Sequence, residues 1–148
     1  MKNLKSVINQ IKSIVSTNQL YKSCGEGNIW EFDTKTNIYP AIWIDAETNL
    51  HQINNGSVVI ILDIYFIDLV YSDEVNELSI KSDTLESAVD FTTFLQNNFS
   101  ELNFYVKDGS YTAQVFSEKW TYKVAGTKLT LNVTLKGSGS NCNNIYSI

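Results

Sequence analysis

Residues that commonly carry catalysis or metal binding are scarce in this chain, which has one histidine and two cysteines. Cys24 and Cys142 are far apart and form no CxxC spacing, which predicts two free thiols and neither a disulfide framework nor a zinc site. His51 lies in a polar loop, no serine has the GxSxG surroundings of a hydrolase nucleophile, and nothing local supports a Cys24–His51 pairing. EF-hand spacing and glycine-rich phosphate loops are also missing. We predict no catalytic, cofactor-binding or metal site.

Long uncharged apolar runs are missing as well. The best candidate, residues 57–71, is interrupted by Asp63 and Asp68 and falls short of the roughly 18 apolar residues that a membrane span needs. The N-terminal residues lack the apolar stretch and the small-residue cleavage site of a signal peptide. We therefore expect a soluble protein with no membrane partner, intracellular where it is made.

Positive charge is not concentrated anywhere in the chain. The formal net charge is −5, and no stretch gathers several basic residues. A nucleic-acid-binding surface is usually a basic patch, because its contacts neutralise phosphates. The charge pattern therefore argues against a protein that grips DNA or RNA.

The length and the composition predict one folded unit with a short tail. A chain of 148 residues fits a single domain, and the near-absence of proline, with only Pro40, agrees with regular secondary structure. Residues 137–148 read GSGSNCNNIYSI, a Gly/Ser/Asn-rich composition. We predict one α+β domain over residues 1–136 and a flexible C-terminal tail over residues 137–148.

Two stretches have the apolar spacing of amphipathic helices. The first predicts a helix over about residues 2–17, with a stripe of Leu4, Val7, Ile8, Ile11, Ile14 and Val15. The second predicts a helix over about residues 83–98, opened by Ser82 or Asp83 as the cap, with Glu86 three residues beyond Asp83. Its expected buried face is Leu85, Ala88, Val89, Thr92 and Leu95.

The remaining patterns predict strands. Ile29, Trp30 and Phe32 indicate a short strand, and residues 38–44 a second one with Pro40 near its start or at an edge. Residues 49–56 are a polar connection that ends in the turn dipeptide Asn55–Gly56, and residues 57–71 form a long strand. From Phe104 the alternation predicts an antiparallel meander with turns at Asp108–Gly109 and Ala125–Gly126. The expected fold is an antiparallel or mixed β-sheet flanked by two helices.

The long strand is apolar on both of its faces. Its even-numbered residues from Val58 to Phe66 are all apolar and are expected to pack on the helices. The opposite face of a one-layer monomer would normally be wetter. We therefore predict that a neighbouring subunit covers it, with Asp63 meeting a donor of that neighbour; the candidate interface is Val59, Ile61, Asp63, Tyr65, Ile67 and Leu69.

Two other functional classes stay open on the residues alone. Three tryptophans and eight tyrosines would suit the core, a protein interface or a ligand cage, and the last of these, with His51, would fit a small α+β ligand-binding domain or a hydrolase-like enzyme. The net negative charge would also fit an inhibitor of a basic toxin.

Several short motifs resemble a known family. They are residues 64–70 (IYFIDLV), the Asn76–Glu77 pair, residues 82–85 (SDTL), residues 39–45 (YPAIWID) and Cys142 in the closing segment. Together, over about residues 38–145, they look like the small neck and tail ring proteins of crAss-like and related Bacteroidetes phages, which are similar to phage tail terminators and tail-completion proteins.

The resemblance implies a tail-terminator-like α+β subunit without enzyme activity or cofactor. Such a subunit assembles into a homo-oligomeric ring at the head–tail connection, is made in the bacterial host cytoplasm and resides in the neck or tail of the virion. Neighbouring neck, tail or portal proteins would be its partners. DNA would pass through the acidic lumen without specific binding. Asp68 would close the long strand, and Ser82 and Asp83 would cap the second helix.

Overall fold

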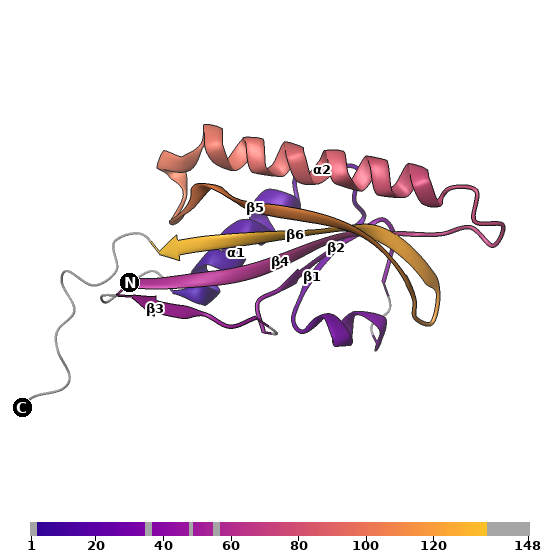
Figure 1. The fold of residues 1–148 in the computed structure, drawn as a ribbon, viewed down its shortest axis with the longest axis horizontal. Coiled ribbons are helices and arrows are strands. Elements are labelled where there is room, and N and C mark those ends of the chain that lie inside the picture. The colour runs from indigo at the N-terminus through magenta and orange to yellow at the C-terminus, as the bar shows by residue number, and fades with distance from the viewer. Residues whose placement is uncertain (1–2, 35–36, 48, 55–56, 136–148) are drawn as a thin grey trace, which may run out of the picture.

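A computed structural model describes residues 3–34, 37–47, 49–54 and 57–135 of the chain, and its elements are shown in Figure 1. The predicted tail, Cys142 and the Asn55–Gly56 turn lie outside these residues. The helices are α1 (Leu4–Val15) and α2 (Glu77–Asn97), with short 3-10 helices η1 (Ile29–Thr34) and η2 (Phe99–Glu101). The strands are β1 (Ser23–Glu26), β2 (Ala41–Asp45), β3 (Gln52–Asn54), β4 (Ser57–Leu69), β5 (Phe104–Lys119) and β6 (Lys123–Leu135).

The six strands form one mixed sheet in the order β1-β2-β4-β6-β5, and β3 pairs with the first part of β4. Only β1 and β2 are parallel; the other pairs are antiparallel. The predicted α+β class with a mixed sheet and two flanking helices is confirmed. β4 is a central strand because it pairs with β2 and β3 on one side and with β6 on the other. β5 and β1 are the outer strands.

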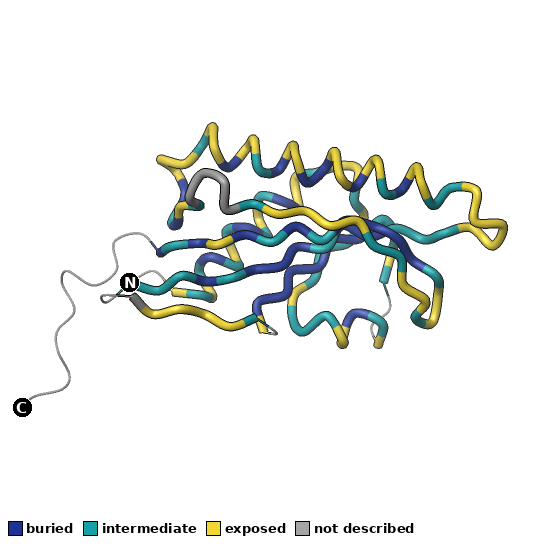
Figure 2. The backbone as a smooth tube through the Cα atoms, in the orientation of Figure 1, coloured by how far each residue is buried: buried dark blue, intermediate teal, exposed yellow. Residues whose placement is uncertain are grey.

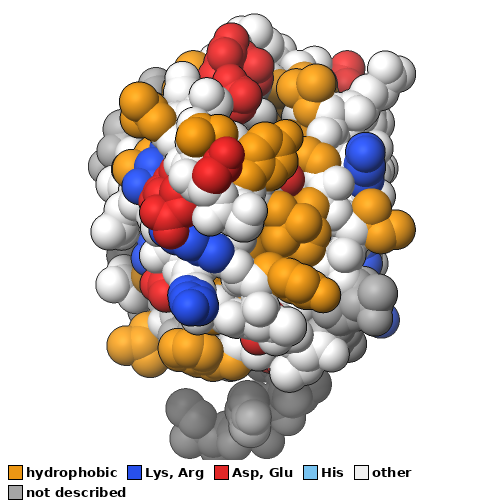
Figure 3. All heavy atoms as spheres, turned by 90° about the vertical axis from the view of Figure 1, so that its right-hand side faces the viewer, with side chains coloured by type: hydrophobic (Ala, Val, Ile, Leu, Met, Phe, Trp, Pro, Cys, Tyr) orange, Lys and Arg blue, Asp and Glu red, His pale blue; other side chains and the backbone are white. Residues whose placement is uncertain are grey.

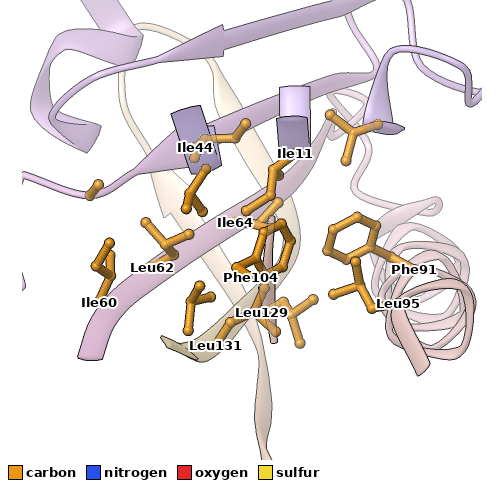
Figure 4. Packing of buried hydrophobic residues seen from close by; sticks show 14 of the residues in the cluster. Ile11, Ile44, Ile60, Leu62, Ile64, Phe91, Leu95, Phe104, Leu129 and Leu131 are labelled. Carbon is orange, nitrogen blue, oxygen red and sulfur yellow. The ribbon is translucent and has the colours of Figure 1, made fainter. Parts of the chain in front are cut away.

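Both α-helices cover the same face of the sheet, and the main core lies between them and the strands (Figure 4). The predicted inward face of β4 is confirmed: Ile60, Leu62, Ile64 and Phe66 are at most 2% exposed. Figure 4 shows Ile11 on one side of Ile64 and the α2 residues Phe91 and Leu95 on another. Full burial of one such side chain contributes about 1.5–3 kcal/mol, so this layer is the main stabilising feature.

Helix α1 forms where its stripe predicts it. Asn3 accepts a hydrogen bond from the Ser6 backbone N–H at 2.9 Å, and the Ser6 hydroxyl approaches the Asn3 N–H in return, which completes a capping box. The buried residues Val7, Ile11 and Val15 are spaced at four-residue intervals and face the sheet.

Helix α2 begins six residues earlier than predicted, at Glu77. Ser82 and Asp83 lie inside the helix, so the expectation that they cap it is wrong. Asn76 precedes the first turn, but its side chain holds the end of β4: it accepts from the Tyr71 N–H at 2.8 Å and donates to the Leu69 carbonyl at 3.0 Å. The physical reason for the early start is tertiary, because Ile80 is buried against the sheet.

The buried face of α2 is also rotated from the predicted one. Ala88 and Leu95 are buried as expected, but Leu85 and Val89 are 39% and 55% exposed. Thr84 is buried because its hydroxyl lies 2.9 Å from the Thr127 hydroxyl of β6, an interaction that no helical periodicity reveals. The full buried set is Ile80, Thr84, Ser87, Ala88, Phe91 and Leu95.

The N-terminal part differs from prediction in two elements. Residues 29–34 form the 3-10 helix η1 and not a strand, whereas the strand of this region is β1, parallel to β2. Pro40 stands directly before β2, as expected for a strand start. The connection after β2 was predicted as polar and irregular, but it contains the short strand β3.

The C-terminal part is one long hairpin. Both predicted turns lie inside strands, and the chain reverses at residues 120–122, where the Trp120 N–H donates to the Tyr122 carbonyl at 3.1 Å. The β5 ladder shifts register between Val106 and Tyr111, around the predicted Asp108–Gly109 turn. Gly126 sits opposite Ile67 of β4, where an added Cβ would lie 1.9 Å from the Phe66 carbonyl oxygen. That glycine therefore permits close strand contact instead of a turn.

Candidate functional site

The sheet face that points away from the helices carries a second, aromatic core. Phe32 of η1 is fully buried there, and its ring makes edge or tilted contacts with Tyr39, Trp43 and Trp120 at centroid distances of 5.5–6.0 Å. Ile67 of β4 belongs to the same cluster and is also fully buried. The short helix η1 thus covers the second half of β4 from within the chain.

Part of the candidate interface on β4 is covered by the chain itself. Ile67 is buried by the chain itself, and Leu69 packs against the aromatic core. Val59, Ile61 and Tyr65 remain partly exposed. The chain therefore supplies part of the cover that we expected from a neighbouring subunit, and an interface through the other positions stays a prediction.

Asp63 finds its donors inside the chain. Its carboxylate accepts from the Asn49 side-chain amide at 2.8 Å and from the Thr130 hydroxyl at 2.6 Å, and it is only 6% exposed. The expectation that Asp63 meets a donor of a neighbour is therefore replaced by an intrachain network. Its partner across the ladder is Asp45, another buried carboxylate, which accepts from the Ile29 and Glu47 N–H groups.

A pocket of about 320 Å³ opens beside the aromatic core. This volume lies at the lower end of the range for small-molecule sites, roughly 300–1,000 Å³. Its apolar walls come from η1, β4 and the β5–β6 hairpin, and three polar side chains stand among them. The lining residues are Ile29, Trp30, Tyr65, Gln114, Phe116, Glu118, Trp120 and Lys128.

Hydrogen bonds hold the η1 wall of this pocket at both ends. At its start, the Ile29 N–H donates to the buried carboxylate of Asp45 at 3.1 Å. Near its end, Asp33 accepts from the backbone N–H and the hydroxyl of Thr121 in the β5–β6 turn. The Trp43 indole N–H also donates to the Gly27 carbonyl at 3.1 Å, just before η1. The pocket is therefore preformed.

The polar groups of the pocket offer both donors and an acceptor. Lys128 and Gln114 are ladder partners on β6 and β5, and Lys128 also pairs with Tyr65 of β4. Burial raises the pKa of Tyr65 above its ordinary value, and the charges of Asp63 and Asp45 add to this effect. The phenol therefore stays protonated at neutral pH and is available as a donor. Glu118 supplies a carboxylate.

A second hollow, of about 400 Å³, lies on the helix side of the sheet. Asp68 faces into it together with Asp83, Glu86 and Asp90 of α2, so Asp68 does more than close the strand. Burial raises the pKa of Asp68. Tyr21 donates to the Ser87 hydroxyl at 2.9 Å, and burial raises its pKa to about 12. Across the described ranges, no group of three or more His, Cys, Asp or Glu side chains is placed to hold a metal ion.

The two residues considered for nucleophilic catalysis lie in different surroundings. His51 is exposed, and its Nδ1 accepts from the Ile61 N–H at 3.3 Å. Cys24 packs against the helix-side core, where burial raises the pKa of its thiol. An activated nucleophile needs the opposite shift. The geometry thus offers no support for a Cys24–His51 pair.

The other feature of functional interest is the outer edge of β5. This strand has 16 residues, and within the described part of the chain it pairs only with β6. Thr112 to Val115 are exposed, and the stretch 110–117 (SYTAQVFS) carries no charge and no proline. Figure 2 shows this contrast, with exposed segments along β5 beside the buried central strands.

An exposed apolar flank of α2 adjoins this edge. Leu78, Leu85 and Val89 share one flank, because they are seven and four residues apart. The other flank carries Asp83, Glu86 and Asp90, which line the hollow toward Tyr21. Helix α2 packs over β6 and β5, so the flank with Leu85 and Val89 lies on the side of β5. Val115, on the helix-facing side of β5, is 43% exposed.

The end of the molecule that holds η1 and the β5–β6 turn has a mixed surface. Figure 3 shows hydrophobic side chains gathered there, beside acidic and basic groups. Exposed hydrophobics from these segments and from the β4–α2 connection include Trp30, Tyr71, Val75 and Tyr122. Residues 71–75 of the β4–α2 connection are exposed, and Lys123 pairs with Glu74 at 2.7 Å and with Glu77 of α2 at 3.4 Å.

In comparisons with known proteins, no family model, curated protein or solved structure matches this chain. No helix among the described residues is long and apolar enough to cross a membrane. The many tryptophans and tyrosines are evident in the sequence, but their clustering around one pocket is not. The pocket residues come from four separated segments, and no local spacing links Trp30 with Lys128.

Proposed function

We propose that this protein is a structural subunit of a homo-oligomeric ring in the neck or tail of a phage particle, and that the open edge of β5 joins its copies. The motif resemblance supports the setting, and the observation that carries the assembly is the outer edge of β5, which pairs with no strand but β6 among the described residues. An edge strand exposes a row of backbone N–H and C=O groups that pair readily with another chain.

The length and chemistry of β5 make it suited to this role. Sixteen residues span about 50 Å, against a usual strand of roughly five or six residues. Natural edge strands that must stay monomeric are commonly blunted by charges, proline or bulges. Here the register shift lies between Val106 and Tyr111, and residues 111–117 beyond it carry no charge and no proline.

The α2 flank supports the same surface. A strand that extends the sheet at β5 would lie beneath the exposed side chains of Leu85 and Val89 and beside Val115. Burial of this apolar area adds about 25 cal/mol for each Å² removed from water. The copies would therefore be held by backbone pairing and by an apolar contact.

A ring sets a geometric condition on this contact. Pairing of β5 with β5 of another copy is two-fold and yields a closed dimer, whereas a ring needs β5 to meet a different surface of its neighbour. In the proposed ring, neighbouring neck, tail or portal proteins contact its ends, and DNA passes through the lumen. The net charge of −5 favours passage without retention.

Native mass spectrometry of the full chain tests the assembly. We expect one closed ring stoichiometry, and we expect Val115→Lys to give monomers, because a charge on the edge opposes strand addition. The matched control is Val75→Lys in the β4–α2 connection, which changes another exposed apolar residue away from both edges of the sheet and should leave the ring intact. A wild-type monomer at high concentration contradicts the assembly, and dimers alone contradict the ring.

The setting needs its own experiment. Antibody labelling of purified virions in the electron microscope should place the chain between head and tail. A ring that retains double-stranded DNA at physiological salt would contradict the proposed passive lumen.

A further inference from the structure

The aromatic pocket presents a tryptophan ring to solvent from a segment that is held in place. Trp30 is 75% exposed, although the η1 segment that carries it is tied at both ends by Asp45 and Asp33. A large ring left in water forgoes the stabilisation that burial would give. Assembly through the β5 edge does not use this ring, because a strand added at the edge extends the sheet and leaves its face open.

We propose that this pocket binds a saccharide and takes one or two pyranose rings. A pyranose has a flat C–H face that packs on an aromatic ring, and it carries hydroxyls around its edge. Trp30, Trp120 and Phe116 supply flat apolar surfaces in the pocket. Lys128 and Gln114 supply donors, and Glu118 supplies an acceptor for the hydroxyls.

The size and the preformed shape agree with this ligand. A volume of about 320 Å³ suits a small ring system and not a long chain. The walls are joined by hydrogen bonds within the protein, so binding requires little ordering of the pocket.

The charges argue against other ring-shaped ligands. Nucleotides also stack on aromatic rings, but their phosphates call for several cations. Among the described residues that line the pocket, Lys128 is the one cation and Glu118 lies on the same hairpin, while the chain has 16 acidic and 11 basic residues. A quaternary ammonium ion would suit an aromatic cage, but Lys128 would repel it. A purely apolar ligand would strip water from three polar side chains.

The three tryptophans allow a direct test by NMR of the indole N–H signals, with cellobiose, maltose and di-N-acetylchitobiose as probes. We expect at least one of these sugars to shift the Trp30 and Trp120 signals in a saturable way at millimolar concentrations. Trp43 is the internal reference, because it is 4% exposed and its indole N–H is bound to the Gly27 carbonyl. Its signal should not move.

Variants separate pocket binding from a general effect on the protein. Trp30→Ala and Glu118→Gln should each weaken binding about tenfold or more, whereas Tyr122→Ala should leave it unchanged. Tyr122 is the matched control, since it is 62% exposed on the same hairpin and does not line the pocket. Trp30 is exposed, so its removal should preserve the fold, and the unchanged signal of Trp43 checks this.

Three results would overturn the proposal. The first is that none of the three sugars shifts the Trp30 and Trp120 signals. The second is that a sugar shifts the Trp120 signal equally in the Trp30→Ala and Tyr122→Ala variants. The third is that thymidine monophosphate binds more tightly than every sugar. None of these results depends on whether the chain forms a ring, so this experiment and the mass spectrometry can fail separately.

Discussion

Asp33 and Thr121 are joined across 88 residues of sequence by three contacts: the Thr121 N–H lies 3.1 and 3.0 Å from the two carboxylate oxygens, and its hydroxyl lies 2.9 Å from one of them. This link connects η1 to the turn of the β5–β6 hairpin. It joins two segments that line the aromatic pocket. The pocket therefore depends on an exposed polar contact as well as on the buried ring of Phe32.

Removal of this link should loosen the pocket. We expect Asp33→Ala to lower the free energy of unfolding by about 1 kcal/mol, because a hydrogen bond to a charged group is lost at a site open to water. Thr121→Ala should lower the free energy of unfolding by less, because the backbone N–H at position 121 still bonds to Asp33. Urea denaturation of the single and double variants checks this, and strictly additive effects would contradict the direct link.

Gly126 should not tolerate a side chain. An alanine Cβ at this position would lie 1.9 Å from the Phe66 carbonyl oxygen and 3.2 Å from Ile67 Cα, both parts of the backbone of the central strand. We expect Gly126→Ala to destabilise the fold by about 3 kcal/mol or more. Thermal unfolding followed by circular dichroism measures this. Thr112→Ala, on the exposed edge strand, should change stability by no more than about 0.5 kcal/mol.

The buried hydroxyl pair of Thr84 and Thr127 should act as a unit. Thr84 also bonds to the Ile80 carbonyl at 2.7 Å, and the pair joins α2 to β6. Replacement of either residue by valine leaves one buried hydroxyl without this partner and should cost about 1–3 kcal/mol. The double variant should cost clearly less than the sum, and a double-mutant cycle in urea measures the difference. Additive costs would mean that the two hydroxyls do not interact.

Asp68 should make stability depend on pH. Burial raises its pKa in the folded protein, and Asp83 adds to this, whereas the Leu69 N–H and Lys22 oppose it. Because the folded state then holds the proton more tightly than the unfolded state, the contribution of Asp68 to stability falls as pH rises from 3.8 through the folded pKa. Asp68→Asn should therefore stabilise the protein at neutral pH and have little effect below the ordinary pKa.

Urea denaturation of the wild type and of Asp68→Asn at neutral pH and at a pH below the ordinary carboxyl pKa tests this prediction. Asp90→Asn is the matched control, since it removes an exposed carboxylate from the same hollow and should change little at either pH. A destabilised Asp68→Asn variant at neutral pH would show that the carboxylate is favoured by partners and not penalised by burial.

The parts of the fold that were predicted correctly are those with strong local periodicity. The stripe of Val7, Ile11 and Val15 repeats over several turns, and the even-numbered residues of β4 from Val58 to Phe66 are apolar without a break, so each element and its buried face can be read from the sequence. The failures are local signals with a non-local cause. Ala125–Gly126 resembles a turn, but Gly126 is needed because the backbone of β4, about sixty residues earlier in the sequence, leaves no room for a side chain.

The candidate site shows the same division. The outward face of β4 was identified correctly as largely apolar, but the residues that cover it could not be predicted from the sequence. Asn49 and Thr130 donate hydrogen bonds to Asp63, and Phe32 packs in the cluster that buries Ile67. These residues come from segments that no sequence spacing relates to β4. The short strand predicted at Ile29, Trp30 and Phe32 also gave no sign that a helix, η1, would fold over the sheet.

The sequence by itself determined the class of this protein: two helices, a long central strand with one face committed to the core, and a chain poor in catalytic and basic residues. Only the tertiary structure decided which residues became neighbours, which strands lie at the edges of the described sheet and where the aromatic rings line a pocket. The physical reason is that periodicity records which side of an element avoids water, whereas the identity of the covering group depends on contacts between distant segments.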